Sequence, residues 1–158
     1  MKKIVLLVVF ITTVFVQASY AQDSTNSQSS ALLQSYFDVK NALIAGNGNT
    51  ASTKAAAFAQ TLQGLSAETV NDASRSALLN GATQIAESKD IKQQREHFAS
   101  FSADMYALAK AVKLTTEPIY YAYCPMKKAH WLSHEATIKN PYFGSSMLTC
   151  GKVEETLK

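Results

Sequence analysis

Residues 90–113 read DIKQQREHFASFSADMYALAKAVK, and this stretch decides the fold. Its apolar side chains recur every three or four residues, at Ile91, Phe98, Phe101, Met105, Leu108 and Val112. This spacing places them on one face of an α-helix. Asp90 followed by Gln93 resembles a capping box, which marks a helix start. The sequence therefore predicts one long amphipathic helix over 90–113.

Three upstream segments share this helical periodicity, and they cover residues 31–45, 50–64 and 67–87. Ser30 is available to cap the first, and Gly46–Asn49 ends it. Because each segment has a single apolar stripe and the turns between them are short, antiparallel neighbours can bury all the stripes together. We expect an up-down four-helix bundle of the all-α (mainly α) class.

The composition changes after Thr115. All three prolines and the only tryptophan, Trp131, follow this point, among closely spaced tyrosines and phenylalanines. A density of aromatic side chains this high is costly unless they are buried. We expect residues 117–152 to form an irregular, aromatic-rich segment packed on the bundle.

Three local structures are predicted within this segment. Ile119–Tyr123 is expected to be extended, because aromatic and β-branched residues favour strands. Residues 133–139 are expected to form one or two helical turns begun by Ser133. Residues 140–144 contain the Asn-Pro pair of a turn.

The N-terminus has the composition of an export signal. Two lysines precede a long apolar run, which ends in small residues before Ala21. We expect a signal peptide over 1–21 cleaved after Ala21, a flexible polar leader over 22–30, and a single helical domain over 31–158. This predicts an exported, periplasmic protein.

Removing the signal also changes the charge. The whole chain carries 15 basic and 12 acidic residues, and loss of two lysines leaves 13 − 12 = +1. So small a charge gives no electrostatic basis for a nucleic-acid partner. No later apolar run reaches the roughly 18 residues needed to cross a bilayer, so no membrane span is expected after cleavage.

Two short segments each pair a thiol with a thioether. Cys124-Pro125-Met126 and Met147-Leu148-Thr149-Cys150 are separated by 150 − 124 = 26 positions between the cysteines. Cys and Met are soft ligands that select Cu(I) over magnesium, calcium or manganese. Cys124, Met126, Met147 and Cys150 are therefore candidate ligands of a soft metal ion.

The same cysteines also fit a disulfide. In an oxidising compartment a pair of cysteines commonly forms one. A Cys124–Cys150 bridge would remove both thiolates from a metal site, so the two hypotheses compete. The alternative to metal binding is thus a disulfide-stapled helical interaction module.

Three histidines are candidates for additional ligands. His97 lies at the edge of the apolar stripe of the predicted fourth helix. His130 and His134 have the i, i+4 spacing that would place two imidazoles on one helical face. The predicted helix start at Ser133 falls between them and spoils that geometry.

The sequence contains no motif of a known catalytic site. It has no Gly-x-Ser-x-Gly, no glycine-rich phosphate loop, no His-Glu-x-x-His and no Cys-x-x-Cys. Its carboxylates fall on predicted helix surfaces, where solvated charges are usual. We therefore expect no enzymatic activity.

The C-terminal segment contains the stretches Tyr120–Met126, Trp131–Ser133, Ile138–Gly144 and Met147–Gly151. Together with Gln94–Phe98 on the fourth predicted helix, they give the whole mature chain a pattern that resembles the bacterial family called domain of unknown function 3347. Residues 127–130 depart from that pattern, because the loop is shorter here and His130 has no counterpart.

The resemblance implies an exported helical domain that stands alone or is joined to the periplasmic adaptor subunits of copper- and silver-type efflux systems. It implies metal ligation by Cys124, Met126, Met147 and Cys150, with His97 as a weaker candidate. We therefore expect a periplasmic copper-binding chaperone, buffer or efflux accessory whose partners are Cu(I) and an efflux adaptor protein.

Overall fold

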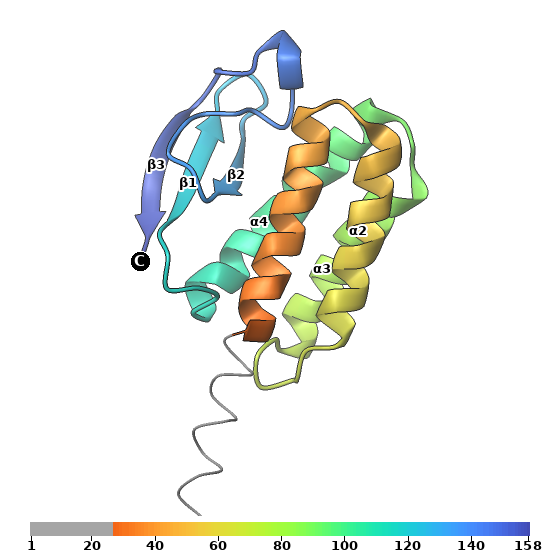
Figure 1. The fold of residues 1–158 in the computed structure, drawn as a ribbon, viewed down its shortest axis with the longest axis vertical. Helices are drawn as coiled ribbons and strands as arrows, with labels where there is room; N and C mark the ends of the chain where they lie inside the picture. Colours follow the sequence, from red (N-terminus) through yellow and green to blue (C-terminus); the bar gives the residue numbers. More distant parts are fainter. Residues whose placement is uncertain (1–26) are drawn as a thin grey trace, which may run out of the picture.

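The computed structural model describes residues 27–158, and these form four helices followed by a small sheet (Figure 1). The chain is helical over 27–44, and three further helices follow: α2 (Gly48–Gln63), α3 (Asp72–Glu87) and α4 (Ile91–Ala111). The predicted signal peptide over 1–21 lies outside the described residues. Residues 27–30, which the sequence assigned to the leader, belong to the first helix.

Side-chain caps fix where the later helices begin. Asn47 accepts a hydrogen bond from the Thr50 N–H at 3.0 Å, so α2 starts a little earlier than predicted. Asn71 caps α3 in the same way, at 2.9 Å from the Ser74 N–H, so α3 starts later than predicted. Asp90 is the N-cap of α4, as predicted. Each cap satisfies a backbone donor that has no partner within its helix.

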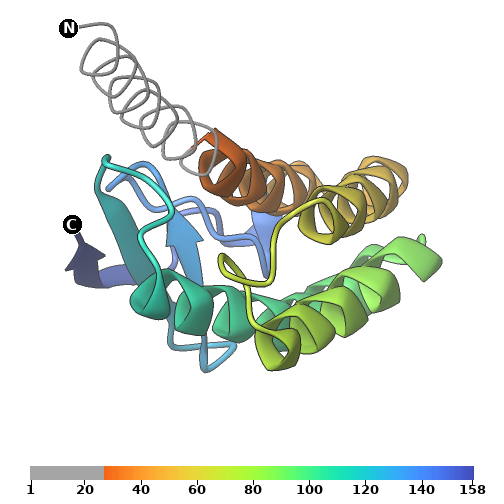
Figure 2. The ribbon, with the colours of Figure 1, turned by 90° about the horizontal axis from the view of Figure 1, so that it is seen from below.

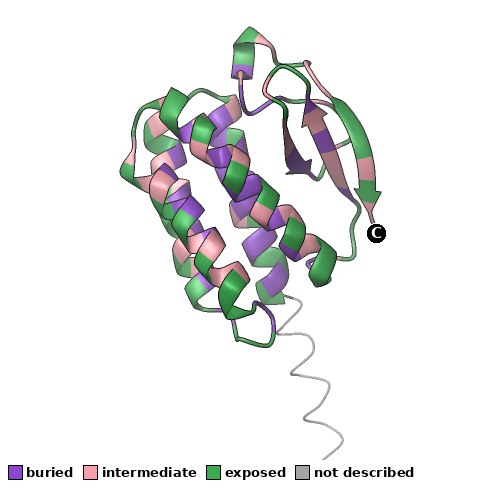
Figure 3. Cartoon of the chain, turned by 180° about the vertical axis from the view of Figure 1, so that it is seen from behind, coloured by how far each residue is buried: buried purple, intermediate pink, exposed green. Residues whose placement is uncertain are grey.

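The apolar stripes of the helices meet in one core (Figure 3). Figure 2 shows helix 27–44 and α2 in one layer and α3 and α4 in a second. Gly81 of α3 lies directly against Phe101 of α4, because a Cβ at position 81 would stand 3.0 Å from the Phe101 Cβ. The predicted helical bundle is therefore confirmed.

A three-stranded antiparallel sheet corrects the all-α prediction. It consists of β1 (Ile119–Cys124), β2 (Ala129–Ser133) and β3 (Lys152–Leu157), in the order β2-β1-β3. The fold is mainly helical with a small C-terminal sheet. The prediction that Ile119–Tyr123 is extended is confirmed, since these residues form most of the central strand.

The helical turn predicted from Ser133 is wrong, because Ser133 is the last residue of β2. The Ser133 hydroxyl does cap a turn by accepting from the Glu135 N–H at 3.1 Å, but no helix follows. Tyr123 of β1 is paired with His130 of β2, and such cross-strand aromatic pairs stabilise a sheet. The turn predicted over 140–144 is confirmed, and it leads into the short 3₁₀ helix Gly144–Ser146.

The buried hydroxyl of Tyr36 joins the sheet to the bundle. It shares a hydrogen bond of 2.7 Å with the Ser102 hydroxyl of α4 and accepts one of 3.0 Å from the Leu132 N–H of β2. Because β2 is an edge strand, this N–H has no partner in the sheet, and Tyr36 supplies one in a place that water does not reach.

Within the described part of the chain, none of the helices is both long and apolar enough to cross a membrane.

We expect Tyr36→Phe to lower the free energy of unfolding by about 1–3 kcal/mol, because it leaves the Leu132 N–H buried without an acceptor. Urea denaturation followed by circular dichroism measures the change. Tyr123→Phe is the matched control, since within residues 27–158 the Tyr123 hydroxyl makes no hydrogen bond and it should change stability by under about 0.5 kcal/mol. Equal effects of both substitutions would contradict the role given to Tyr36.

Candidate metal centre

The sheet brings the two cysteines together. Cys124 is the last residue of β1 and is fully buried, and Cys150 lies two residues before β3. Tyr123 is paired with Lys152 across the two strands, so Gly151, the residue after Cys150, comes opposite Cys124. The Cys124 side chain lies close enough to the Cys150 thiol to raise its pKa, and both cysteines are free.

Asn140 holds the two cysteine segments in place. Its side-chain Nδ2 donates to the Cys124 Sγ at 3.1 Å and to the Cys150 carbonyl at 2.7 Å. Its Oδ1 accepts from the Tyr142 N–H, and its own N–H donates to the Leu148 carbonyl, both at 2.8 Å. Asn140 is 0% exposed, so every one of these bonds forms without competition from water.

Sequence reasoning placed Asn140 in a turn and did not recognise it as a residue of the site. The signal available was an Asn-Pro pair between two cysteines, and this pair predicts only a turn. A buried amide that donates to a sulfur atom depends on tertiary contacts that the local sequence does not encode.

Backbone donors also point at both sulfur atoms. The Lys127 N–H donates to the Cys124 Sγ at 3.4 Å, and the Met126 N–H lies near the Cys150 sulfur. Burial raises the pKa of the Cys150 thiol, the adjacent Cys124 raises it further, and the Met126 N–H opposes them. Cys150 is therefore protonated at neutral pH, and a metal ion that binds its thiolate must displace a proton.

The two methionines lie on the turns that flank the cysteines. Met126 sits in the turn closed by the hydrogen bond from the Lys128 N–H to the Cys124 carbonyl, and 65% of its side chain is exposed. Met147 is half-buried, and its carbonyl accepts from the Cys150 N–H at 3.1 Å. The structure thus brings the two predicted sulfur segments to one end of the sheet, where Asn140 joins them, and Met126 is exposed to solvent.

His97 lies on α4 and lines a shallow hollow at the α3–α4 turn together with residues such as Gln84, Glu87 and Gln93. None of the four sulfur-bearing residues lines that hollow. The sequence placed His97 at the edge of the apolar stripe but could not tell which neighbouring element that edge faces.

The other two histidines do not form a helical pair. His130 lies in β2, where it bonds Glu154 of β3 at 2.9 Å and stacks on Tyr121. His134 lies beyond the end of β2, beside Glu135 at 3.4 Å. In an extended chain, residues four positions apart lie far from each other, so the imidazoles of His130 and His134 are not brought together as they would be on one face of a helix.

The donor set fits a soft metal ion. Among residues 27–158, no group of three or more His, Cys, Asp or Glu side chains is arranged to hold a metal ion. In this described part of the chain the two cysteines therefore have no third His, Cys, Asp or Glu side chain as a further ligand, and the remaining candidate ligands are the methionine sulfurs. Two thiolates with neighbouring thioethers suit Cu(I). Gly151, the residue after Cys150, lies directly against Trp131, because a Cβ at position 151 would stand 2.7 Å from the Trp131 ring.

A family model described as "Protein of unknown function (DUF3347)" matches residues 32–117. The matched range covers α2, α3 and α4 and includes His97. It ends before β1, so the resemblance expected over the whole mature chain is found only in the helical part. No curated protein and no solved structure matches the chain.

We expect Asn140→Asp to slow alkylation of Cys150 at pH 8 by roughly threefold to tenfold, since a pKa one unit higher gives about tenfold less thiolate. The new carboxylate adds a negative charge beside the thiols and removes an N–H donor from Cys124. Mass spectrometry of iodoacetamide-treated protein gives the rate.

Asn80→Asp, at an exposed position of α3, adds the same charge away from the thiols and serves as the control. Circular dichroism checks that both variants are folded. If alkylation of Cys150 is as fast in Asn140→Asp as in Asn80→Asp, Asn140 does not tune the thiol pair.

Proposed function

The chain belongs to the family described as protein of unknown function (DUF3347), and we propose that it binds Cu(I) through Cys124 and Cys150. The observation that carries this proposal is that two free cysteines from segments 26 positions apart lie side by side, joined by the Asn140 amide, which donates to the Cys124 sulfur and to the Cys150 carbonyl. Two adjacent thiolates form a soft site that disfavours hard cations.

The surroundings support loading of a metal ion. The N–H groups of Asn140 and Lys127 already point at the Cys124 sulfur and can stabilise the negative charge that builds up when the thiols lose their protons. Binding then follows the release of protons from Cys124 and Cys150. Met147 and Met126 are close enough in the chain to supply a thioether.

We further propose that the protein is exported and acts in the periplasm as a copper chaperone, buffer or accessory of a heavy-metal efflux system. The predicted signal peptide and the resemblance to domains joined to efflux adaptors support this role. The exposed Met126 adds support, because a thioether in solvent next to a buried thiol offers a second soft donor through which an ion can enter or leave.

The same proximity of the two cysteines favours one competing function. Two neighbouring thiols can be oxidised to a disulfide, which would staple β1 to the start of β3 in an interaction module without a metal role. Closing a loop of this length stabilises a fold by about 3 kcal/mol relative to the open chain. The two functions require different states of the cysteines in the active protein: free thiols for metal binding and a disulfide for the interaction module.

We expect Cys124→Ser and Cys150→Ser each to weaken Cu(I) binding by at least about a hundredfold, because the loss of either thiolate leaves a single anionic ligand. Titration of the reduced protein against a competing chelator measures the affinity. His97→Ala is the control and should stay within about twofold of the parent protein, since His97 lies at the α3–α4 turn. Unchanged affinity in both serine variants would overturn the proposal.

A thiol count on protein purified without reductant separates the two functions. Two free thiols with tight one-to-one copper binding support metal handling. A disulfide, with no copper binding even after reduction, supports the stapled module. In that case the serine variants should lose about 2–4 kcal/mol of stability relative to the oxidised parent, whatever metal is present.

The two thioethers should contribute unequally. We expect Met147→Leu to weaken Cu(I) binding more than Met126→Leu, because Met147 is half-buried beside Cys150 whereas Met126 is exposed. We expect Met126→Leu instead to slow transfer of Cu(I) to a chelator. Stopped-flow transfer kinetics and equilibrium titration of the two variants separate these effects, and Met105→Leu in the core is the matched control.

A further inference from the structure

Lys40 is a buried cation outside the thiol site. It lies on helix 27–44, and only 3% of its surface is exposed. Its Nζ lies 5.2 Å from the centre of the Phe37 ring. Lysine is almost never buried this completely without a paired anion, because removing the ammonium from water is costly.

The Lys40 ammonium has fewer partners than it has protons. Among the described residues, its Nζ donates one hydrogen bond, to the Ser133 hydroxyl at 3.2 Å, and it forms no ion pair. An ammonium has three donors. The neighbouring Glu135 carboxylate is engaged elsewhere, with Lys139 at 2.7 Å and His134 at 3.4 Å.

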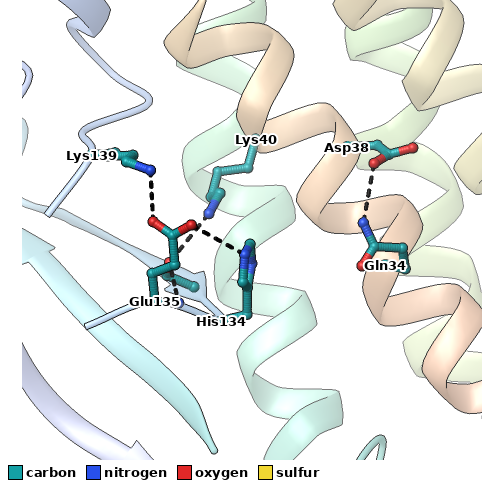
Figure 4. A network of polar contacts seen from close by, with 7 residues as sticks. Gln34, Asp38, Lys40, His134, Glu135 and Lys139 are labelled. Carbon is teal, nitrogen blue, oxygen red and sulfur yellow. Dashed lines mark hydrogen bonds and ion pairs between the residues drawn. The ribbon is translucent and has the colours of Figure 1, made fainter. Parts of the chain in front are cut away.

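These side chains converge on a hollow of about 320 Å³ (Figure 4). Lys40 comes from helix 27–44, and His134, Glu135 and Lys139 come from the segment that follows β2. The remaining wall of the hollow is formed by Asn41, Ile44 and Ala45. The hollow therefore combines the buried amine with a second lysine, one carboxylate and a small apolar wall.

We propose that this hollow binds a small oxyanion, the carboxylate or phosphate group of a small molecule, with Lys40 as its principal partner. An oxyanion would accept the two ammonium protons of Lys40 that have no acceptor and would supply its missing counter-ion. Lys40 and Lys139 together outweigh Glu135, so the hollow has a net positive charge. The apolar wall of Ile44 and Ala45 suits a short carbon chain on the ligand.

The protonation of Lys40 gives this site a characteristic pH dependence. Burial lowers the pKa of Lys40 to about 8, Glu135 opposes this shift and Lys139 adds to it. The charged and titratable groups that face the amine are His134, Glu135 and Lys139. Anion binding needs the protonated amine, so affinity is full well below pH 8 and falls as the pH rises through 8. A bound anion raises the pKa of Lys40, so this fall continues up to the higher pKa of the complex.

Calorimetric titration of the purified protein with sodium acetate and sodium phosphate, at constant ionic strength and pH 6.5, tests the proposal. We expect Lys40→Met to weaken binding at least tenfold, because methionine keeps the apolar stem and removes the charge. Lys92→Met, at an exposed position on α4, removes the same charge outside the hollow and should stay within twofold of the parent protein. Raising the pH to 9.5 should weaken binding by the parent protein at least tenfold.

A second measurement distinguishes the loss of anion binding in Lys40→Met from a loss of folding. We expect the thermal midpoint of the parent protein to rise with increasing anion concentration, and that of Lys40→Met to stay constant while circular dichroism shows it folded. Stronger binding of acetate identifies a carboxylate ligand, and stronger binding of phosphate a phosphorylated one. If neither anion binds, or if Lys40→Met responds as the parent does, the proposal is overturned.

Discussion

The antiparallel pairing of β1 with its two neighbours is the constraint on which the rest of the C-terminal half depends. β1 lies between β2 and β3, and its residue Tyr123 is paired with both His130 and Lys152. This register brings Cys150 to the end of β1, where Cys124 stands. The loop between β2 and β3 then has to fold over the end of the sheet, and Asn140 supplies the polar contacts that this loop needs inside the protein.

The bundle matters to this site because it buries one side of the sheet. β2 packs against α4, and Tyr36 reaches it from helix 27–44. Two ion pairs that join the bundle to the C-terminal segment, Lys127–Glu96 and Lys110–Glu155, lie on the surface and add little to stability. Burial and the buried hydrogen bonds of Tyr36 with Leu132 and of Lys40 with Ser133 therefore contribute more to the docking, and the helices act as a platform for the thiol pair.

The sequence predicts the helices well because their stripes repeat every three or four residues over many turns. It misses β3, since Lys152–Leu157 is a mostly exposed edge strand of polar residues whose partner is the distant Ile119–Cys124. The soft-ligand segments could be recognised from residue type alone. Their proximity, the role of Asn140 and the hollow that His97 lines could not be, because each depends on which elements meet in three dimensions.

The contact between Tyr36 and Leu132 spans 96 positions of the chain. All three strands, by contrast, lie within residues 119–157, and α2, α3 and α4 pack mainly with their sequence neighbours. Closing so long a loop costs more chain entropy than forming a hairpin or a helical pair. We therefore expect the sheet to form as one cooperative unit, and its docking on helix 27–44 to be a late step of folding.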